Sequence, residues 1–249
     1  MKRIYFIGLF LLISYASRSQ TIATDTVPNS KTIVFKPKAL IIPAVLIGYG
    51  VVGLESHTLK LFNSEISEEV SEHIDDKFTI DDISQYTPFL SVYALNAMGI
   101  QGKHNFKDRS IILGTAYLIM GGSINILKHT AYVERPDGTS KNSFPSGHTA
   151  TAFMGAEFLY QEYKDVSVWY GITGYAIATG TGFFRVYNNR HWLTDVSAGA
   201  GIGILSTKIA YWVHPFIKKH IFKDKESING MVMPFYNGHE SGLSAVITF

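Results

Sequence analysis

The chain has 249 residues, and its 22 Lys and Arg against 20 Asp and Glu leave a net charge of +2. The length is typical of one domain with short appendages, and the charge balance excludes a nucleic-acid binder that works through a broad basic surface. Because the sequence has no cysteine, disulfide scaffolds, thiolate zinc sites, cysteine nucleophiles and Cys-ligated iron–sulfur clusters are excluded as well.

The N-terminus has the layout of a secretory signal. Lys2 and Arg3 precede an apolar stretch, 4–13, and small residues follow it up to residue 20. We expect residues 1–20 to be a signal peptide, because the apolar stretch is too short to span a bilayer; an uncleaved membrane anchor is the alternative. The polar residues 21–38 are expected to form a lead-in.

Apolar runs then alternate with polar connectors, and their length and Leu, Ile, Ala and Gly content favour helices over strands. The runs are 39–54, 88–100, 110–127, 149–160, 166–182 and 193–213. We therefore predict an all-α fold, a six-helix bundle with its catalytic loops at one end, formed by residues 39–213. Some runs are short for a hydrocarbon core of roughly 30 Å.

Residues 214–249 are expected to form a basic segment and a hairpin tail. Asn237 and Gly238 lie between two runs of strand-forming residues, which is a typical hairpin signal.

Within the bundle, Gly199 and Gly203 are spaced to face one neighbouring helix, which predicts close helix packing. The connector 55–87 holds nine acidic residues and two lysines, which we interpret as a solvated helical face or loop and not as a cation site.

Charged and polar residues gather in two loops. The first contains Lys128, Arg135 and, just before an apolar run, the sequence Pro-Ser-Gly-His at 145–148; the second contains Arg185, His191 and Asp195. One pair of apolar runs separates these loops. Because two antiparallel helices return the chain to the side it left, we expect the two loops to meet at one end of the bundle.

Such a site suits an anion, and phosphate is the first choice. Lys128, Arg135 and Arg185 would supply three cations, of which guanidinium groups match tetrahedral oxyanions well. Ser146 and Gly147 open a helix, whose first N–H groups and dipole favour negative charge. The sequence therefore predicts a phosphate-binding cradle.

Two histidines in these loops have distinct expected roles. His191 and Asp195 are four residues apart on one helix face, so Asp195 can fix the imidazole tautomer and leave the other nitrogen as a nucleophile. His148 can then act as general acid on the departing alkoxide. The cradle would stabilise the transition state. These groups suffice for phosphomonoester hydrolysis without a metal or other cofactor.

The three clusters resemble the motifs of the type 2 phosphatidic acid phosphatase and vanadium haloperoxidase superfamily: Lys-x6-Arg-Pro, Pro-Ser-Gly-His and Ser-Arg-x5-His-x3-Asp. The match spans residues 128–195. The resemblance implies phosphate binding by Lys128, Arg135, Ser146, Gly147 and Arg185, a phosphohistidine formed on His191 and oriented by Asp195, and acid–base catalysis by His148. One position departs, because Phe184 stands where the family has Ser.

Within this superfamily, the apolar helices favour a membrane-associated bacterial phosphatase that acts on a lipid phosphate or diphosphate. The alternatives are a soluble periplasmic acid phosphatase, a vanadium-dependent haloperoxidase, and a non-catalytic binding module. The distribution of Lys and Arg between the connectors favours a site on the periplasmic side of the cell envelope.

Overall fold

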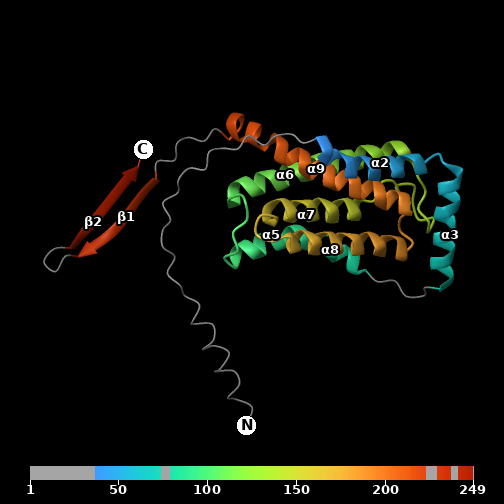
Figure 1. The fold of residues 1–249 in the computed structure, drawn as a ribbon, viewed down its shortest axis with the longest axis horizontal. Coiled ribbons are helices and arrows are strands. Elements are labelled where there is room, and N and C mark those ends of the chain that lie inside the picture. The colour runs from blue at the N-terminus through green and yellow to red at the C-terminus, as the bar shows by residue number, and fades with distance from the viewer. Residues whose placement is uncertain (1–36, 74–78, 223–228, 237–240, 249) are drawn as a thin grey trace, which may run out of the picture. The chain divides into compact units, whose positions relative to one another are not determined.

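The computed structural model describes residues 37–73, 79–222, 229–236 and 241–248 (Figure 1). The predicted signal peptide and all of the lead-in before Pro37 lie outside the described residues. The elements, in chain order, are the 3-10 helix η2 (Pro37–Leu40), the α-helices α2 (Ile41–Gly53), α3 (His57–His73), α4 (Ile80–Ser84), α5 (Thr87–Ala97), α6 (Phe106–Ala131), α7 (Gly147–Tyr163), α8 (Val168–Tyr187) and α9 (Leu193–His220), and the strands β1 (Asn229–Tyr236) and β2 (Ser241–Thr248).

The predicted all-α fold class is confirmed, and each of the six apolar runs overlaps a helix over most of its length. The described residues hold two further helices, α3 and α4, both in the acidic connector. Polar residues cap two of the helices. Asn105 accepts a hydrogen bond from the N–H of Asp108 at the start of α6 (2.8 Å), and Ser167 accepts one from the N–H of Trp169 at the start of α8 (3.3 Å).

The two strands at the C-terminus pair antiparallel, with Asn229 opposite Thr248 and Tyr236 opposite Ser241. The expected turn at Asn237 and Gly238 lies outside the described residues.

Helix α7 lies at the centre of the bundle, where it contacts α5, α6, α8 and α9, and α2 packs on α9 (Figure 1). Small residues on α9 allow this packing. A Cβ on Gly203 would overlap the carbonyl oxygen of Ala150, and one on Gly199 would overlap that of Ser146. The close packing predicted from the spacing of the two glycines is therefore confirmed, and it brings the start of α7 against α9.

Helix α3 crosses one end of the bundle, bent by 89° from the helical segment that ends at Gly53 (Figure 1). Its Asn63 donates a hydrogen bond to the hydroxyl of Thr194 in the first turn of α9 (2.9 Å), and Ser67 donates one to Asn189 (2.7 Å). The glutamates of α3 are exposed, as a solvated helical face requires. Helix α3 thus borders the end of the bundle at which the α8–α9 loop lies.

The last helix differs from the sequence expectation, because α9 continues past Val213 to His220. Its basic last turn is held against α6: Lys218 lies 3.0 Å from a carboxylate oxygen of Asp108, and His214 lies 3.4 Å from the other. Cations at a helix C-terminus are also favoured by the helix dipole. Residues 214–220 therefore belong to the bundle rather than to a separate tail.

One described helix, α6, is long and apolar enough to cross a membrane, and only 22% of its apolar stretch is buried; the bent segment from Pro37 to Glu72 would be a second. Large apolar side chains are also exposed on the outer faces of other helices, among them Ile42 and Val45 on α2 and Trp169 and Phe183 on α8. Such extended apolar surface marks a membrane or an interface when it is found on a folded bundle.

Candidate active site

The loop between α6 and α7 and the loop between α8 and α9 meet at one end of the bundle. The N–H of Ser146 donates to the backbone oxygen of Asp195 (3.1 Å), and the indole N–H of Trp192 donates to the backbone oxygen of Glu134 (2.8 Å). These bonds join segments about fifty residues apart in sequence, and they place the residues of all three motifs around one region.

His191 and Asp195 are both buried, with side chains about 1% exposed. The Asp195 carboxylate accepts hydrogen bonds from the hydroxyl of Ser143 (2.5 Å) and from the N–H of Trp192 (3.0 Å), which also caps the start of α9. His191 Nδ1 lies 3.6 Å from this carboxylate and 3.4 Å from the Ser143 hydroxyl. The carboxylate thus faces one ring nitrogen and leaves Nε2 for other chemistry.

Burial lowers the pKa of His191 to about 4, because the charged imidazolium loses its solvation. The Asp195 carboxylate opposes this shift, and the positive charges of Arg185 and Lys128 add to it. His191 is therefore neutral at ordinary pH, which is the state that a nucleophile requires.

Two of the predicted cations are positioned by one residue, Asn142. The Lys128 ammonium donates to the backbone oxygen of Asn142 (2.6 Å), and Arg135 Nε donates to its side-chain oxygen (3.0 Å). The hydroxyl of Ser140 donates to the same side-chain oxygen (2.8 Å). Asn142 therefore holds Lys128 and Arg135 close to one another.

The third cation, Arg185, is buried at the end of α8 and forms an ion pair with Asp81 of α4. Its Nη1 lies 2.5 Å from Asp81, and the other oxygen of this carboxylate accepts a hydrogen bond from Asn188 (3.0 Å). The Nε of Arg185 is buried and has no hydrogen-bond partner among the described residues. Such a donor is costly to leave unpaired, so the site is suited to receive an acceptor there.

Arg135 and Arg185 line the same cavity of about 250 Å³. The charge of Arg185 also lowers the pKa of Arg135, after burial, which has the largest effect. The cavity is lined by Arg135, Arg185, Arg190, His148, Asp81 and Asp82, among others. Lys128 does not line it but lies beside Arg135 through Asn142. The guanidinium groups thus share a hollow that could hold a phosphate.

His148 borders this cavity, and its Nε2 lies 2.8 Å from a carboxylate oxygen of Asp82. Burial lowers its pKa below the ordinary 6.5 and Arg185 lowers it further, whereas the hydrogen bond to Asp82 raises it. Asp81, Asp82 and His148 could together hold a metal ion by geometry. However, both carboxylates lie within 4 Å of the Arg185 guanidinium, which balances their charge in this structure.

The start of α7 differs in one detail from the predicted cradle. Ser146 is fully buried, its N–H is bonded to Asp195, and its hydroxyl lies 2.9 Å from that of Thr149. Ser146 therefore fixes the position of the α7 N-terminus. Gly147 and His148 follow it, and the orphan N–H groups of a first helical turn are suited to an anion.

Phe184, the departure from the family motif, packs between aromatic neighbours. Its ring centroid lies 5.6 Å from that of Phe183 and 5.8 Å from that of Tyr187. A serine hydroxyl at this position could donate one hydrogen bond, whereas the phenyl ring contributes apolar contact.

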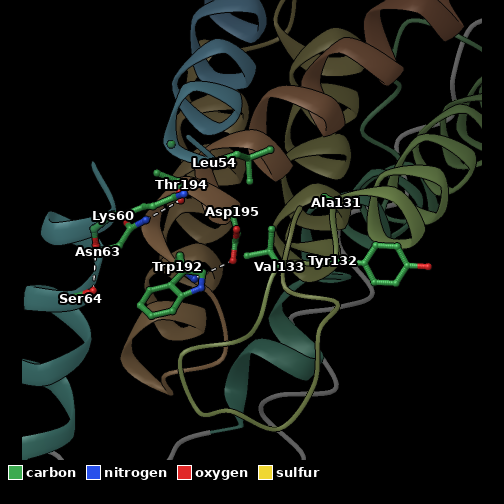
Figure 2. A pocket seen from close by; sticks show the side chains of 11 residues that line it. Leu54, Lys60, Asn63, Ser64, Ala131, Tyr132, Val133, Trp192, Thr194 and Asp195 are labelled. Carbon is green, nitrogen blue, oxygen red and sulfur yellow. Dashed lines mark hydrogen bonds between the residues drawn. The ribbon is translucent and has the colours of Figure 1, made fainter. Parts of the chain in front are cut away.

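A second cavity, of about 320 Å³, lies on the other side of Asp195 (Figure 2). Figure 2 shows Asp195 directed toward Trp192, with Val133 beside it and Asn63 and Lys60 of α3 at the far wall. The second carboxylate oxygen of Asp195 has no hydrogen-bond partner among the described residues.

Sequence reasoning missed four polar residues of the site. Asp81 and Asp82 were counted among the solvated acids, and no local pattern distinguishes them from the glutamates of α3. Asn142 and Ser143 directly precede the Phe-Pro-Ser-Gly-His sequence, and their position next to that motif is the one signal that could have drawn attention to them.

Comparison with known proteins identifies the class. Residues 109–219, which include nearly all of α6 to α9 and the loops between them, match the sequence model of the PAP2 superfamily. This confirms the family resemblance of the three motifs.

The chain is homologous to lipid A 1-phosphatase of Porphyromonas gingivalis, with 40% identity over 153 residues, which is 60% of this chain and 33% of the relative. It is 31% identical to bacitracin transport permease protein BcrC of Bacillus licheniformis over 74 residues, which is 30% of this chain and 34% of that protein. The chain thus spans about a third of the length of the curated relatives it matches.

Two solved structures resemble the fold. One is a transmembrane PAP2 type phosphatidylglycerolphosphate phosphatase from Bacillus subtilis, with 19% identity and a TM-score of 0.45. The other is Aquifex aeolicus LpxE, with 21% identity and a TM-score of 0.41. Each likeness covers 72% of this chain and 98% of the other chain.

Proposed function

We propose that this protein is a phosphatase that removes phosphate from a lipid phosphate or diphosphate without a metal. The observation that carries the proposal is a buried, neutral His191 that faces Asp195 and whose backbone N–H donates to the backbone oxygen of Arg185 (3.3 Å), a residue that lines one cavity with Arg135 and His148. A nucleophile, an oxyanion cradle and an acid are the three parts that phosphoryl transfer through a covalent intermediate requires.

In the proposed reaction, His191 Nε2 attacks phosphorus, a P–N bond forms, and the ester P–O bond breaks. His148 gives its proton to the departing alkoxide, so that the alcohol leaves neutral. Water then attacks the phosphohistidine, His148 takes a proton from that water, and inorganic phosphate leaves. Lys128, Arg135 and Arg185 stabilise the charge on the phosphoryl oxygens in both steps.

A lipid substrate is supported by the apolar outer faces of α2, α6 and α8, which would let an amphiphile reach the site from a bilayer. We place the protein in the membrane of the bacterial cell envelope with its active site on the periplasmic side, a placement supported by the signal-like N-terminus and the Lys and Arg distribution. The Porphyromonas relative makes lipid A 1-phosphate the first substrate to test.

The test is phosphate release by purified protein in detergent from lipid A 1-phosphate, phosphatidate, phosphatidylglycerol phosphate, a polyprenyl diphosphate and a soluble monoester. We expect at least one lipid to be hydrolysed faster than the soluble monoester, no effect of EDTA, and competitive inhibition by orthovanadate. Faster turnover of the soluble ester would favour the soluble acid phosphatase. If EDTA abolishes activity and a divalent ion restores it, the metal-free mechanism is contradicted. Oxidation of bromide by peroxide would favour the haloperoxidase.

The pKa shifts predict an acidic pH optimum. As the pH rises through about 4, His191 loses its proton and kcat/KM should increase; as the pH rises past the lowered pKa of His148, the acid is lost and kcat/KM should fall, at a pH below 6.5. Because kcat/KM reports the free enzyme, a profile between pH 3 and 9 measures both limbs. An optimum above about pH 6.5 would contradict these assignments.

A further inference from the structure

Helix α4 carries two adjacent carboxylates that approach the site in different ways. Asp81 is 1% exposed and is fixed by Arg185 and Asn188. A further contact, between the hydroxyls of Ser84 and Thr181 (2.7 Å), also ties α4 to α8. These contacts hold α4 in place and leave Asp82 over His148.

Asp82 and His148 form a second carboxylate–imidazole pair in an environment opposite to that of the first. The side chains of His191 and Asp195 are about 1% exposed, whereas those of His148 and Asp82 are 31% and 57% exposed. Paired groups whose environments differ in this way divide acid and base roles between them. A buried pair keeps its imidazole neutral, and a solvent-exposed pair can take up and release protons.

We infer that Asp82 is a positioning residue for the proposed reaction: it holds the His148 ring through Nε2–H and supports the imidazolium that the acid step requires. The inference rests on the proposed function. Because Asp82 engages Nε2, Nδ1 is the nitrogen left to transfer the proton. When Nδ1–H protonates the leaving alkoxide, Nε2–H stays bonded to Asp82, and the proton that His148 later takes from water restores the imidazolium.

The charges around His148 make this carboxylate necessary. Arg185 of α8 lowers the pKa of His148 and so disfavours an imidazolium, and Arg135 and Arg190 of the adjacent loops line the same cavity. On α4, Asp81 is already paired with Arg185. Asp82 lies 3.9 Å from Arg185 but only 2.8 Å from His148 Nε2, and it is therefore the carboxylate in direct contact with His148 among the residues that line this cavity.

The experiment compares wild type with Asp82→Asn, which keeps the shape and a hydrogen-bond acceptor but removes the charge. The substrates are a long-chain alkyl phosphate and an aryl phosphate with the same chain, since an aryl oxide leaves without protonation. General acid catalysis contributes about 10²–10⁴-fold, so we expect kcat/KM for the alkyl ester, which reports the steps up to departure of the alcohol, to fall by about 10-fold or more. We expect little change in kcat/KM for the aryl ester, and an alkaline limb of the kcat/KM profile of the alkyl ester at lower pH.

Two variants serve as controls. Asp165→Asn changes an exposed carboxylate in the α7–α8 connector, at the other end of α7, and should leave both substrates unaffected. Asp82→Glu restores the charge and should recover part of the loss for the alkyl ester.

Equal losses for the two esters in Asp82→Asn would show a merely structural role and overturn the inference, as would unchanged kinetics. A lower KM with undiminished kcat would also overturn it, because Asp82 would then be a competitor of the phosphate. If wild type releases no phosphate from any substrate, the proposed function itself fails; if wild type is active and the variant shows no leaving-group effect, only the role of Asp82 is wrong.

Discussion

Replacement of His191 by alanine is expected to abolish phosphate release. The variant removes the nitrogen that forms the covalent intermediate, and loss of a nucleophile in comparable enzymes costs up to about 10⁶-fold in kcat. We therefore expect a fall of about 10⁴-fold or more. The measurement is release of inorganic phosphate from the best substrate of the panel, at equal concentrations of folded protein.

Because His191 is buried, its replacement could also disturb folding, and two controls separate the effects. His191→Asn retains a polar side chain of similar size and should be equally inactive while eluting from gel filtration as wild type does. His220→Ala removes a histidine at the far end of α9 and should keep full activity. Turnover near the wild-type rate in a folded His191 variant would refute the nucleophile assignment.

The second large effect is expected for Arg185→Lys. In wild type, Arg185 binds Asp81 through Nη1 and has a second donor, the unpartnered Nε, for the phosphate. Lysine preserves the charge but lacks the planar guanidinium group, so its single nitrogen cannot serve both partners in this geometry. Removing a single transition-state donor costs about 10²–10³-fold in kcat, and we expect a loss of that size. Alanine is less informative, because an unpaired Asp81 would destabilise the fold by about 3–5 kcal/mol.

The comparison for this variant is Arg190→Lys. Arg190 lines the same cavity, but its Nη1 is already bound to Asp137 (3.0 Å), and its side chain is 40% exposed. A smaller loss is therefore expected than for Arg185→Lys. The losses of the two variants are compared as kcat at saturating substrate. A larger loss for Arg190→Lys than for Arg185→Lys would mean that Arg190, and not Arg185, contacts the phosphoryl group in the transition state.

The sequence was sufficient to predict six of the eight α-helices among the described residues and the convergence of the two loops that carry the three motifs. Helices follow from the length and composition of the apolar runs, and the convergence of the loops follows because α7 and α8 form one antiparallel pair. The close approach of α7 and α9 was readable in Gly199 and Gly203, since small residues at this spacing allow backbones to touch.

The role of α4 could not be read in the same way. Asp81 lies 104 residues before Arg185, and Asp82 lies 66 residues before His148. The same connector holds the exposed glutamates of α3, so composition alone classifies the whole connector as a solvated segment. Only the packing of α4 on α8 distinguishes the two aspartates, and such packing is a property of the tertiary fold.

Asn142 and Ser143 illustrate a second limit. Neither residue type indicates a role in a loop, because Asn and Ser are common in turns for local reasons. Their functions come from partners on other elements: Lys128 at the end of α6 for Asn142, and Asp195 at the start of α9 for Ser143. These contacts support the charged residues that the motifs did identify.

The central claim is that His191 carries the phosphoryl group, and the most direct measurement is capture of the intermediate. Enzyme mixed with substrate for a few milliseconds, quenched in alkali and digested is analysed by mass spectrometry. The account predicts a phosphoryl group on the peptide that contains His191 and no such group when His191 is replaced by alanine. It also predicts that phosphate is released no faster than this adduct decays. Rapid phosphate release with no phosphorylated peptide, or with the group on His148, would contradict it.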